Sequence, residues 1–315
     1  MKALGIILAG GNSTRMRSLS DKRAISAMPV ACSYRSIDFT LSNMTNSHVQ
    51  TVAVLSQYNA RSLNEHLNSA KWWNFGRKQG GLFLFTPTVT SDNSWWYRGT
   101  ADAMWQNIDF LKRRHEPYVI IASGDCIYKQ DFNPVLEYHI NRQAEITVVC
   151  AKMPDGDDIS RFGTVTMDAD GLITDFEEKP MMAHSNIVST GTYIMRRRKL
   201  IELLEQCNAE GRYNFVTDIL IRYKGMKKIF GFLTESYWSN IASVESYYRT
   251  NMDFLKPEVR DFFFRGEQKI YSKAQDLPPA KFNAGSSVKN CLVGSGTIIN
   301  SQVENSVLFK KVFVG

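Results

Sequence analysis

The sequence has no hydrophobic run long enough to cross a membrane. Its 315 residues are 43% hydrophobic, but the apolar stretches are short, and none approaches the roughly 20 residues that a membrane helix needs. The stretch from Ala3 to Ala9 ends in Gly10 and Gly11 rather than in a small-residue cleavage site, so we do not expect a secretory signal. We therefore expect a cytoplasmic protein without a membrane segment.

Cysteine is also scarce. The five residues Cys32, Cys126, Cys150, Cys207 and Cys291 are odd in number and scattered, and no two form a C-x-x-C pair. This pattern argues against a disulfide framework and against a zinc site, and it favours a reducing compartment.

Positive charge is in excess, with a formal net charge of +7. The densest basic run, Arg196–Lys199, leads into the helical pattern "LIELLEQ", and we interpret it as a solvated helix start, because nucleic-acid proteins interleave such charges with exposed aromatics or glycines. We expect no nucleic-acid partner. The excess charge, including Lys22, Arg23 and Arg35, is compatible with phosphorylated metabolite or nucleotide ligands and equally with an ordinary basic surface.

Short apolar runs alternate with helical patterns through most of the chain. "LGIILAG", "TVAVLSQ", "EPYVIIASGD" and "AEITVVCAKM" are typical of buried strands, and amphipathic segments separate them. This alternation predicts an α/β fold with a mostly parallel sheet covered on both faces. Ligands bind at the carboxyl ends of such strands, so the "AGG" and "SGD" turns are predicted to share one cleft.

The chain changes character after residue 255. Residues 256–283 show no sustained period and contain a Pro-Pro pair, which indicates a connector. In residues 284–315 apolar side chains recur at about every fifth position, with Gly, Ser and Asn between, at Val288, Val293, Ile298, Val303 and Leu308. Such repeats are typical of parallel β-helix coils, with a surface β-meander as the alternative. A coil ending at Gly315 would leave an unpaired edge, so we expect either more chain beyond it or a covering partner.

The first turn has features of a phosphate-binding loop. Gly10 and Gly11 allow a phosphate to approach the backbone amides closely, and Arg15 can bind its oxygens. A glycine pair after one strand is weak support by itself. Asp125, in the "SGD" turn, is either a magnesium ligand or a turn and cap residue.

Several segments together resemble one family. "LAGGNSTRM", "YRSIDFTLSNMTNS", "WYRGTADAMWQN", "ASGDCIYKQDF", "RFGTVTMDADGLITDFEEKP" and "VSTGTYIM" occur in one order and resemble the sugar-phosphate nucleotidyltransferases, specifically the ADP-glucose pyrophosphorylase (glucose-1-phosphate adenylyltransferase) family. The resemblance implies a Rossmann-like nucleotidyltransferase domain with a mostly parallel mixed sheet over residues 1–255, and the first coils of a left-handed parallel β-helix over residues 284–315. It also implies tetramers and the conversion of ATP and glucose 1-phosphate to ADP-glucose and pyrophosphate, in glycogen biosynthesis.

The sequence departs from the family pattern around the phosphates. The third glycine of the family's A-G-G-x-G-x-R-L loop is Ser13, and the family's phosphate-binding lysine aligns with Ile25. The second magnesium carboxylate, in the family segment W-R-D-V-G-T, aligns with Asn240, and the flanking arginine and glycine align with Ser239 and Ala242. Only the first carboxylate position is kept, as Asp125. No cofactor is expected, apart from Mg²⁺ if any activity is retained.

Other family positions are kept. The resemblance assigns the sugar-phosphate pocket to Glu178, Lys179, Ser189 and Gly191. It assigns the nucleotide side, as a remnant, to Gly10, Gly11, Arg15, Gln57, Gly99, Thr100 and Ala101. Shared ancestry of the fold is the alternative explanation for their retention.

Two interpretations follow. The degenerate phosphate site is similar to that of the non-catalytic GlgD-type subunit of Gram-positive bacteria, which implies a regulatory subunit that joins a catalytic sister in a heterotetramer. The alternative is an active adenylyltransferase with weakened chemistry. For the isolated chain a homo-oligomer is the alternative assembly.

Overall fold

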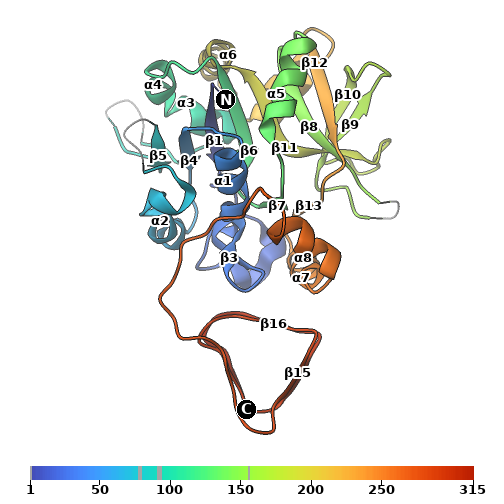
Figure 1. Cartoon of the computed structure of the whole chain (residues 1–315). Helices are drawn as coiled ribbons and strands as arrows, with labels where there is room; N and C mark the ends of the chain where they lie inside the picture. The colour runs from blue at the N-terminus through green and yellow to red at the C-terminus, as the bar shows by residue number, and fades with distance from the viewer. Residues whose placement is uncertain (1, 77–79, 91–93, 155–156) are drawn as a thin grey trace.

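A computed structural model describes residues 2–76, 80–90, 94–154 and 157–315. Its centre is a nine-stranded sheet (Figure 1). The strands are β1 (Ala3–Leu8), β4 (Thr51–Leu55), β5 (Gly81–Phe85), β6 (Tyr118–Ser123), β8 (Ile146–Lys152), β9 (Gly163–Met167), β10 (Ile173–Glu178), β11 (Ile187–Arg196) and β12 (Ile229–Thr234).

The sheet is parallel in one half and mixed in the other. Its order is β10-β9-β11-β6-β1-β4-β5, with β8 paired to both β11 and β12. Strands β5, β4, β1 and β6 run parallel to their neighbours in that order, and β12 runs parallel to β8. Strand β11 is antiparallel to β6, β8 and β9. The predicted α/β fold with a mixed, Rossmann-like sheet is confirmed.

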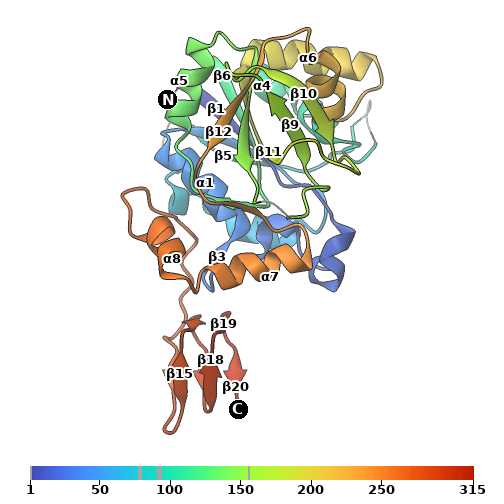
Figure 2. The same ribbon diagram turned by 90° about the vertical axis from the view of Figure 1, so that its right-hand side faces the viewer.

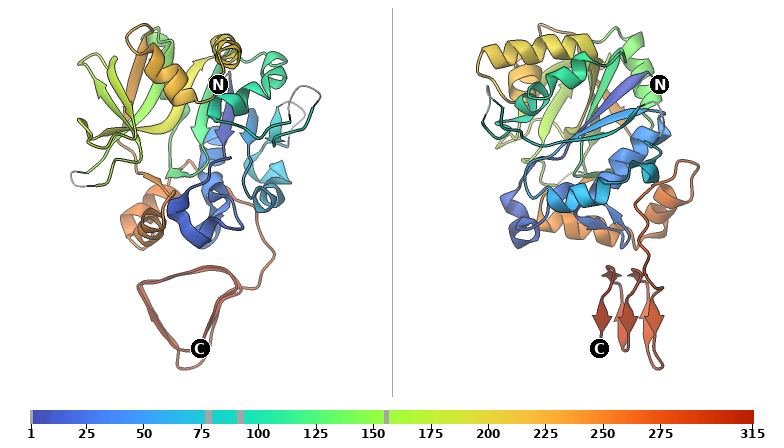
Figure 3. Two further views of the ribbon diagram at one scale, coloured as in Figure 1. Left: turned by 180° about the vertical axis from the view of Figure 1, so that it is seen from behind. Right: turned by 90° about the vertical axis from the view of Figure 1, so that its left-hand side faces the viewer.

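Helices cover both faces of the sheet (Figures 2 and 3). Alternate side chains of the strands point to opposite faces, so Leu4 and Ile6 of β1 join the core with α3, α4 and α6, whereas Ala3 and Ile7 join the core with α1, α2 and α5. The α-helices of the described residues are α1 (Ser36–Asn46), α2 (Arg61–Leu67), α3 (Thr100–Trp105), α4 (Ile108–Lys112), α5 (Phe132–Asn141), α6 (Arg197–Ala209), α7 (Val244–Asp253) and α8 (Pro257–Phe264). The other helical turns, which are not α-helical, are η1 (Thr14–Ser20), η2 (Ile25–Ala27), η3 (Ala70–Trp73) and η4 (Val216–Ile221).

The basic run at residues 196–199 lies at the start of α6, as predicted. Arg197 is not simply solvated, because its Nε donates to the Glu116 carbonyl at 2.8 Å and its Nη1 donates to the Leu111 carbonyl at 2.9 Å. These bonds fasten α6 to the end of α4 and the turn before β6.

Two short strand pairs lie beyond the carboxyl ends of the main strands. β2 (Pro29–Val30) pairs with β3 (Tyr34–Arg35), and β7 (Cys126–Tyr128) pairs antiparallel with β13 (Trp238–Asn240). The second pair sets Cys126 opposite Asn240. It therefore joins the "SGD" turn to a segment more than a hundred residues away.

A third apolar cluster lies below the sheet and includes the C-terminal helices. Phe254 and Phe263 are fully buried there, with Met16 and Ile25 from the amino-terminal segment. The connector expected over residues 256–283 therefore contains a structured part, because helix α8 packs its Phe263 into this cluster. The four residues "DFFF" span only about one helical turn, which is too short to show a helical period in the sequence.

The C-terminal segment forms stacked parallel strand pairs around a triangular outline (Figure 1). The pairing offset is 15 residues in two of the stacks, so Val288 lies beside Val303 and Val293 beside Leu308. Parallel pairing confirms the β-helix start and excludes the meander. Its handedness stays a prediction. The strands are β14 (Lys281–Phe282), β15 (Ser287–Lys289), β16 (Leu292–Val293), β17 (Ile298–Ile299), β18 (Gln302–Glu304), β19 (Val307–Leu308) and β20 (Phe313–Val314).

Among the described residues, no helix combines the length and apolar character required to span a membrane.

Candidate functional site

The candidate site is a cleft at the carboxyl ends of β1 and β6. It consists of a main cavity of about 710 Å³ and an inner cavity of about 190 Å³. Gly11 lines the inner cavity and Asp125 lines both, so the "AGG" and "SGD" turns share one cleft as predicted. The main cavity also holds Ser13, Arg15, Glu178, Lys179, Ser189, Gly191 and Asn240, and the inner cavity holds Ile25 and Thr100.

Ser13, in the loop after β1, has ordinary backbone geometry. It lies in the extended region with φ −139°, so its side chain does not strain the backbone. Its hydroxyl donates to the Ala242 carbonyl at 2.7 Å. The loop is therefore tethered to the segment that follows β13.

Ile25 supplies no charge to the phosphate region. It is 4% exposed and packs in the third apolar cluster with Met16 and Met28, while it also borders the inner cavity together with Asp125. At the position where the family resemblance places a lysine, the inner cavity is therefore lined by an apolar side chain.

The metal region contains one carboxylate and one neutral amide. Asp125 Oδ1 accepts a hydrogen bond from Ser123 Oγ at 2.5 Å, and Asn240 Oδ1 accepts from the Ala242 N–H at 2.9 Å. Burial, reinforced by the charge of Asp125, raises the pKa of the Cys126 thiol well above its usual range, so Cys126 stays a neutral thiol. It receives a weak bond from Asn240 Nδ2 at 3.6 Å.

These groups fit a magnesium ion poorly. Protein sites hold Mg²⁺ through one or two carboxylates with octahedral geometry, but the Asn240 amide oxygen is already engaged by a backbone N–H. Within the described ranges, no group of three His, Cys, Asp or Glu side chains is arranged to hold a metal ion.

The sugar-phosphate side keeps its charged groups available. Lys179 is 65% exposed in its side chain, and its Nζ lies 3.5 Å from Glu178 Oε1. Strand β11 is irregular between Ser189 and Thr192, and Gly191 there has φ 74°, a conformation that favours glycine. This irregularity turns the backbone toward the cleft, where Ser189 and Gly191 line the main cavity.

Four of the residues assigned to the nucleotide side have structural roles. The Gln57 amide accepts from the Tyr97 N–H at 2.6 Å and donates to the Tyr97 carbonyl at 3.4 Å. A Cβ at Gly99 would lie 2.3 Å from the Tyr213 carbonyl oxygen, so a glycine is required there. Thr100 accepts from the Phe215 N–H at 2.9 Å, and the Ala101 N–H donates to the Tyr213 carbonyl at 2.8 Å. Packing therefore explains their retention without a ligand.

Gly10, which is also assigned to the nucleotide side, lies beside Gln57. A Cβ at Gly10 would come within 3.4 Å of Gln57 Cβ, which is ordinary contact. Gly10, Gln57, Gly99 and Ala101 are not among the residues that line the two cavities.

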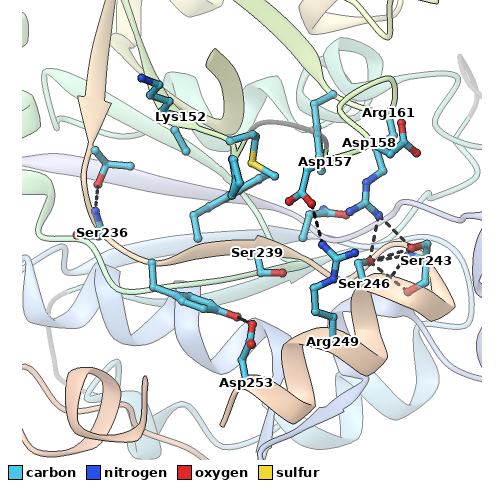
Figure 4. A pocket seen from close by; sticks show the side chains of 18 of the residues that line it. Lys152, Asp157, Asp158, Arg161, Ser236, Ser239, Ser243, Ser246, Arg249 and Asp253 are labelled. Atoms are coloured by element: carbon cyan, nitrogen blue, oxygen red, sulfur yellow. Dashed lines mark hydrogen bonds and ion pairs between the residues drawn. The ribbon is translucent and has the colours of Figure 1, made fainter. Parts of the chain in front are cut away.

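Two arginines near the cleft were not predicted. Arg161 lines the main cavity together with Arg15, and Arg249 of α7 lines a neighbouring chamber of about 1070 Å³ that shares Arg15 and Arg161 with it (Figure 4). The "RFGT" segment that contains Arg161 was part of the family resemblance, but its arginine carries no signal of its own. Arg249 lies in a helical surface pattern that predicts only solvent exposure.

The amino-terminal cations Lys22, Arg23 and Arg35 do not line the cleft or the neighbouring chamber. Arg35 Nη1 donates to the Ser62 carbonyl at 2.7 Å and to its hydroxyl at 3.0 Å. Arg35 is therefore bonded within the fold.

Comparison with known proteins gives one consistent result. A family model described as "Nucleotidyl transferase" matches residues 4–257. A glucose-1-phosphate adenylyltransferase of Pseudothermotoga lettingae is 36% identical over 317 residues, covering 100% of this chain and 75% of that protein. Proteins of the same name from Desulfitobacterium hafniense and Geobacillus stearothermophilus are 35% and 36% identical, covering all of this chain and 79% and 82% of their own lengths.

Proposed function

Given that the chain belongs to the nucleotidyl transferase family, as a homologue of the glucose-1-phosphate adenylyltransferases, we propose that it is a regulatory subunit of such an enzyme. In this proposal it assembles with a catalytic sister chain into a heterotetramer and raises the rate at which the sister makes ADP-glucose for glycogen synthesis. Its own phosphate site turns over negligibly.

One observation carries the proposal: two cleft positions to which the family resemblance assigns charged side chains carry no charge. Ile25 is apolar and buried in a hydrophobic cluster, and Asn240 is a neutral amide whose oxygen accepts a backbone hydrogen bond. The two positions come from different segments, and each lines a cavity of the cleft that Asp125 also lines.

The reaction explains why these two replacements matter. An oxygen of the glucose 1-phosphate phosphate attacks the α-phosphorus of ATP, the bond to the β-phosphate oxygen breaks, and pyrophosphate leaves with the electron pair. Negative charge accumulates on the transferred group and the leaving group, so cations must be positioned in advance. Removing one such group typically lowers turnover by about 10²- to 10³-fold, and losses within one site are not additive.

The sugar-phosphate side supports a binding role after turnover is lost. Lys179 is exposed in the cleft beside Glu178, and the irregular β11 segment with Gly191 is retained. Binding of a sugar phosphate there could bias the shape of this subunit and so influence its partner.

The second candidate is an active adenylyltransferase, and the names of the relatives favour it. Each relative named above is a glucose-1-phosphate adenylyltransferase, and Arg15, Asp125 and Lys179 are in the cleft. Under this alternative another cation and another carboxylate would replace the groups missing at Ile25 and Asn240.

The test is ADP-glucose synthesis by this chain alone, by the catalytic sister alone, and by an equimolar mixture. The proposal predicts background activity for this chain and a mixture faster than the sister by itself. A mixture no faster than the sister contradicts the regulatory role, and robust activity of this chain alone supports the second candidate. Sedimentation of the mixture shows independently whether a hetero-oligomer has formed.

A further inference from the structure

The neighbouring chamber brings together three arginines from distant parts of the chain. Arg15 comes from η1, Arg161 from the segment between β8 and β9, and Arg249 from α7. Figure 4 shows Arg161 and Arg249 facing the same space, with the carboxylates Asp157 and Asp158 close to them. We call Arg15, Arg161 and Arg249 the arginine cluster.

Two aspartates pair with the cluster at its exposed end. Arg249 Nη1 lies 3.2 Å from Asp157 Oδ1, and Arg15 Nη1 lies 3.8 Å from Asp158 Oδ2. Three of the four side chains are more than half exposed. Exposed ion pairs of this kind contribute little to stability, so a competing anion can displace the carboxylates at low cost.

Arg161 is held in place by hydrogen bonds to the start of α7. Arg161 Nη1 donates to Ser243 Oγ and Ser246 Oγ, each at 3.0 Å. Ser243 is the N-cap residue of α7 and Ser246 closes its capping box. The guanidinium is thus positioned next to the amino-terminal end of a ten-residue helix, whose partial positive charge also attracts anions.

Arg161 also has a donor to spare. Its Nε–H is buried and has no hydrogen-bond partner among the described residues. Burial lowers the pKa of the Arg161 guanidinium, with Asp158 opposing that shift and Arg15 and Arg249 adding to it. The five charged groups therefore act on one another across a short space.

We propose that Arg15, Arg161 and Arg249 form a binding site for a small phosphate anion or phosphomonoester, and that the Asp157 and Asp158 carboxylates occupy this site in its absence. Phosphate oxygens match the forked donors of arginine, and a phosphate group carries more negative charge than a single carboxylate. Arg15 lines both the cleft and the chamber. An anion bound by the arginine cluster would therefore hold the Arg15 guanidinium in the chamber and away from the cleft. The proposal does not require the chain to be a regulatory subunit.

Isothermal titration with inorganic pyrophosphate, and separately with inorganic phosphate, tests the site. Arg249→Gln removes one cluster member without disturbing the core, because its side chain is 67% exposed, and we expect affinity to fall about tenfold. The double variant Asp157→Asn with Asp158→Asn removes the competing carboxylates, and we expect affinity to rise several-fold.

Lys256→Gln is the matched control. Lys256 lines the same chamber but pairs with Asp253 at 2.7 Å, so the variant removes one positive charge from the chamber without touching the cluster. We expect its affinity to stay within about twofold of the parent chain, since its charge is exposed and screened. If Lys256→Gln and Arg249→Gln lowered the affinity equally, the loss would come from the overall charge of the chamber and not from the arginine cluster, which would overturn the proposal.

Two further results would also overturn the proposal. One is unchanged affinity in Arg249→Gln, and the other is no binding by either the parent chain or the double aspartate variant at millimolar ligand. These titrations measure neither turnover nor assembly. The anion site can therefore be refuted while the regulatory role holds, and the regulatory role can be refuted while the anion site holds.

Discussion

The two sides of the cleft differ in how their polar groups are used. On the sugar-phosphate side Lys179 is largely exposed and is paired only with a neighbouring glutamate. On the nucleotide side Ser13 and Asn240 are bonded to the backbone of Ala242, Gln57 is bonded to the backbone of Tyr97, and Ile25 is apolar. Retention of a residue type therefore does not imply retention of a free functional group.

The same contrast separates two kinds of retained glycine. Gly99 is required by the fold, because a Cβ would lie 2.3 Å from a carbonyl oxygen that accepts two helix N–H groups. A Cβ at Gly11 would meet no described atom within 4 Å. Gly11 has no packing reason to be glycine, and its position on the inner cavity suits close approach of a ligand.

The largest expected effect comes from this pair of glycines. Gly99→Ala should lower the free energy of unfolding by about 3 kcal/mol, because the clash is with backbone that cannot move without breaking the start of α3. Gly11→Ala should change it by less than about 0.5 kcal/mol. Urea denaturation of both variants checks this, and equal effects would erase the distinction between structural and functional glycines.

The next effect tests whether the sugar-phosphate side still binds. Lys179→Ala should weaken glucose 1-phosphate binding by about 10- to 100-fold, since a charge-assisted hydrogen bond to phosphate is lost. Lys152→Ala, which removes an equal charge from the neighbouring chamber, serves as the control and should bind normally. Calorimetry that finds the two variants alike would show that retention of Lys179 is only ancestral.

A smaller effect is expected where the nucleotide side lost its second carboxylate. Without metal, Asn240→Asp should cost about 1 kcal/mol of stability, because two carboxylates then face each other. Millimolar MgCl₂ should restore that loss in the variant and leave the parent chain unchanged. Thermal unfolding with and without the salt measures both, and a clear magnesium shift in the parent chain would contradict the account of Asn240.

The smallest effect concerns the tether at Ser13. Ser13→Ala removes the bond to the Ala242 carbonyl and should cost about 0.5–1 kcal/mol in the free energy of unfolding. Turnover should stay at background, because Ile25 and Asn240 are unchanged. Denaturation and an activity assay on the same preparation check both statements; activity appearing in this variant would make the tether, not the lost charges, the cause of inactivity.

Local periodicity predicted most of the fold. The runs "LGIILAG" and "TVAVLSQ" became β1 and β4, and the five-residue recurrence in the tail became the faces of the β-helix coil, because these patterns depend on which side chains must be buried. The segment "ADAMWQNIDFLKRRH" is one of the amphipathic segments expected between the strands, and the structure divides it into α3 and α4 at Asn107.

The positions of the site residues were predictable in part. The β1 and β6 turns meet because parallel strands end at one edge of a sheet, and Asp125 and Gly11 do so here. The hydrogen bond from Ser13 to Ala242 spans 229 residues, and those from Arg161 to Ser243 and Ser246 span 82 and 85. Such contacts depend on the packing of α7 and β13 against the loop, which no local pattern records.

The most direct test of the central claim is ADP-glucose synthesis by the purified chain alone, with saturating ATP, Mg²⁺ and glucose 1-phosphate, beside the same assay on Ile25→Lys combined with Asn240→Asp. We predict background activity in the parent chain and a measurable gain in the double variant, because a cation and a carboxylate return to positions that line the same cavities as Asp125. Robust turnover by the parent chain would contradict it, since other groups would then be neutralising the phosphates.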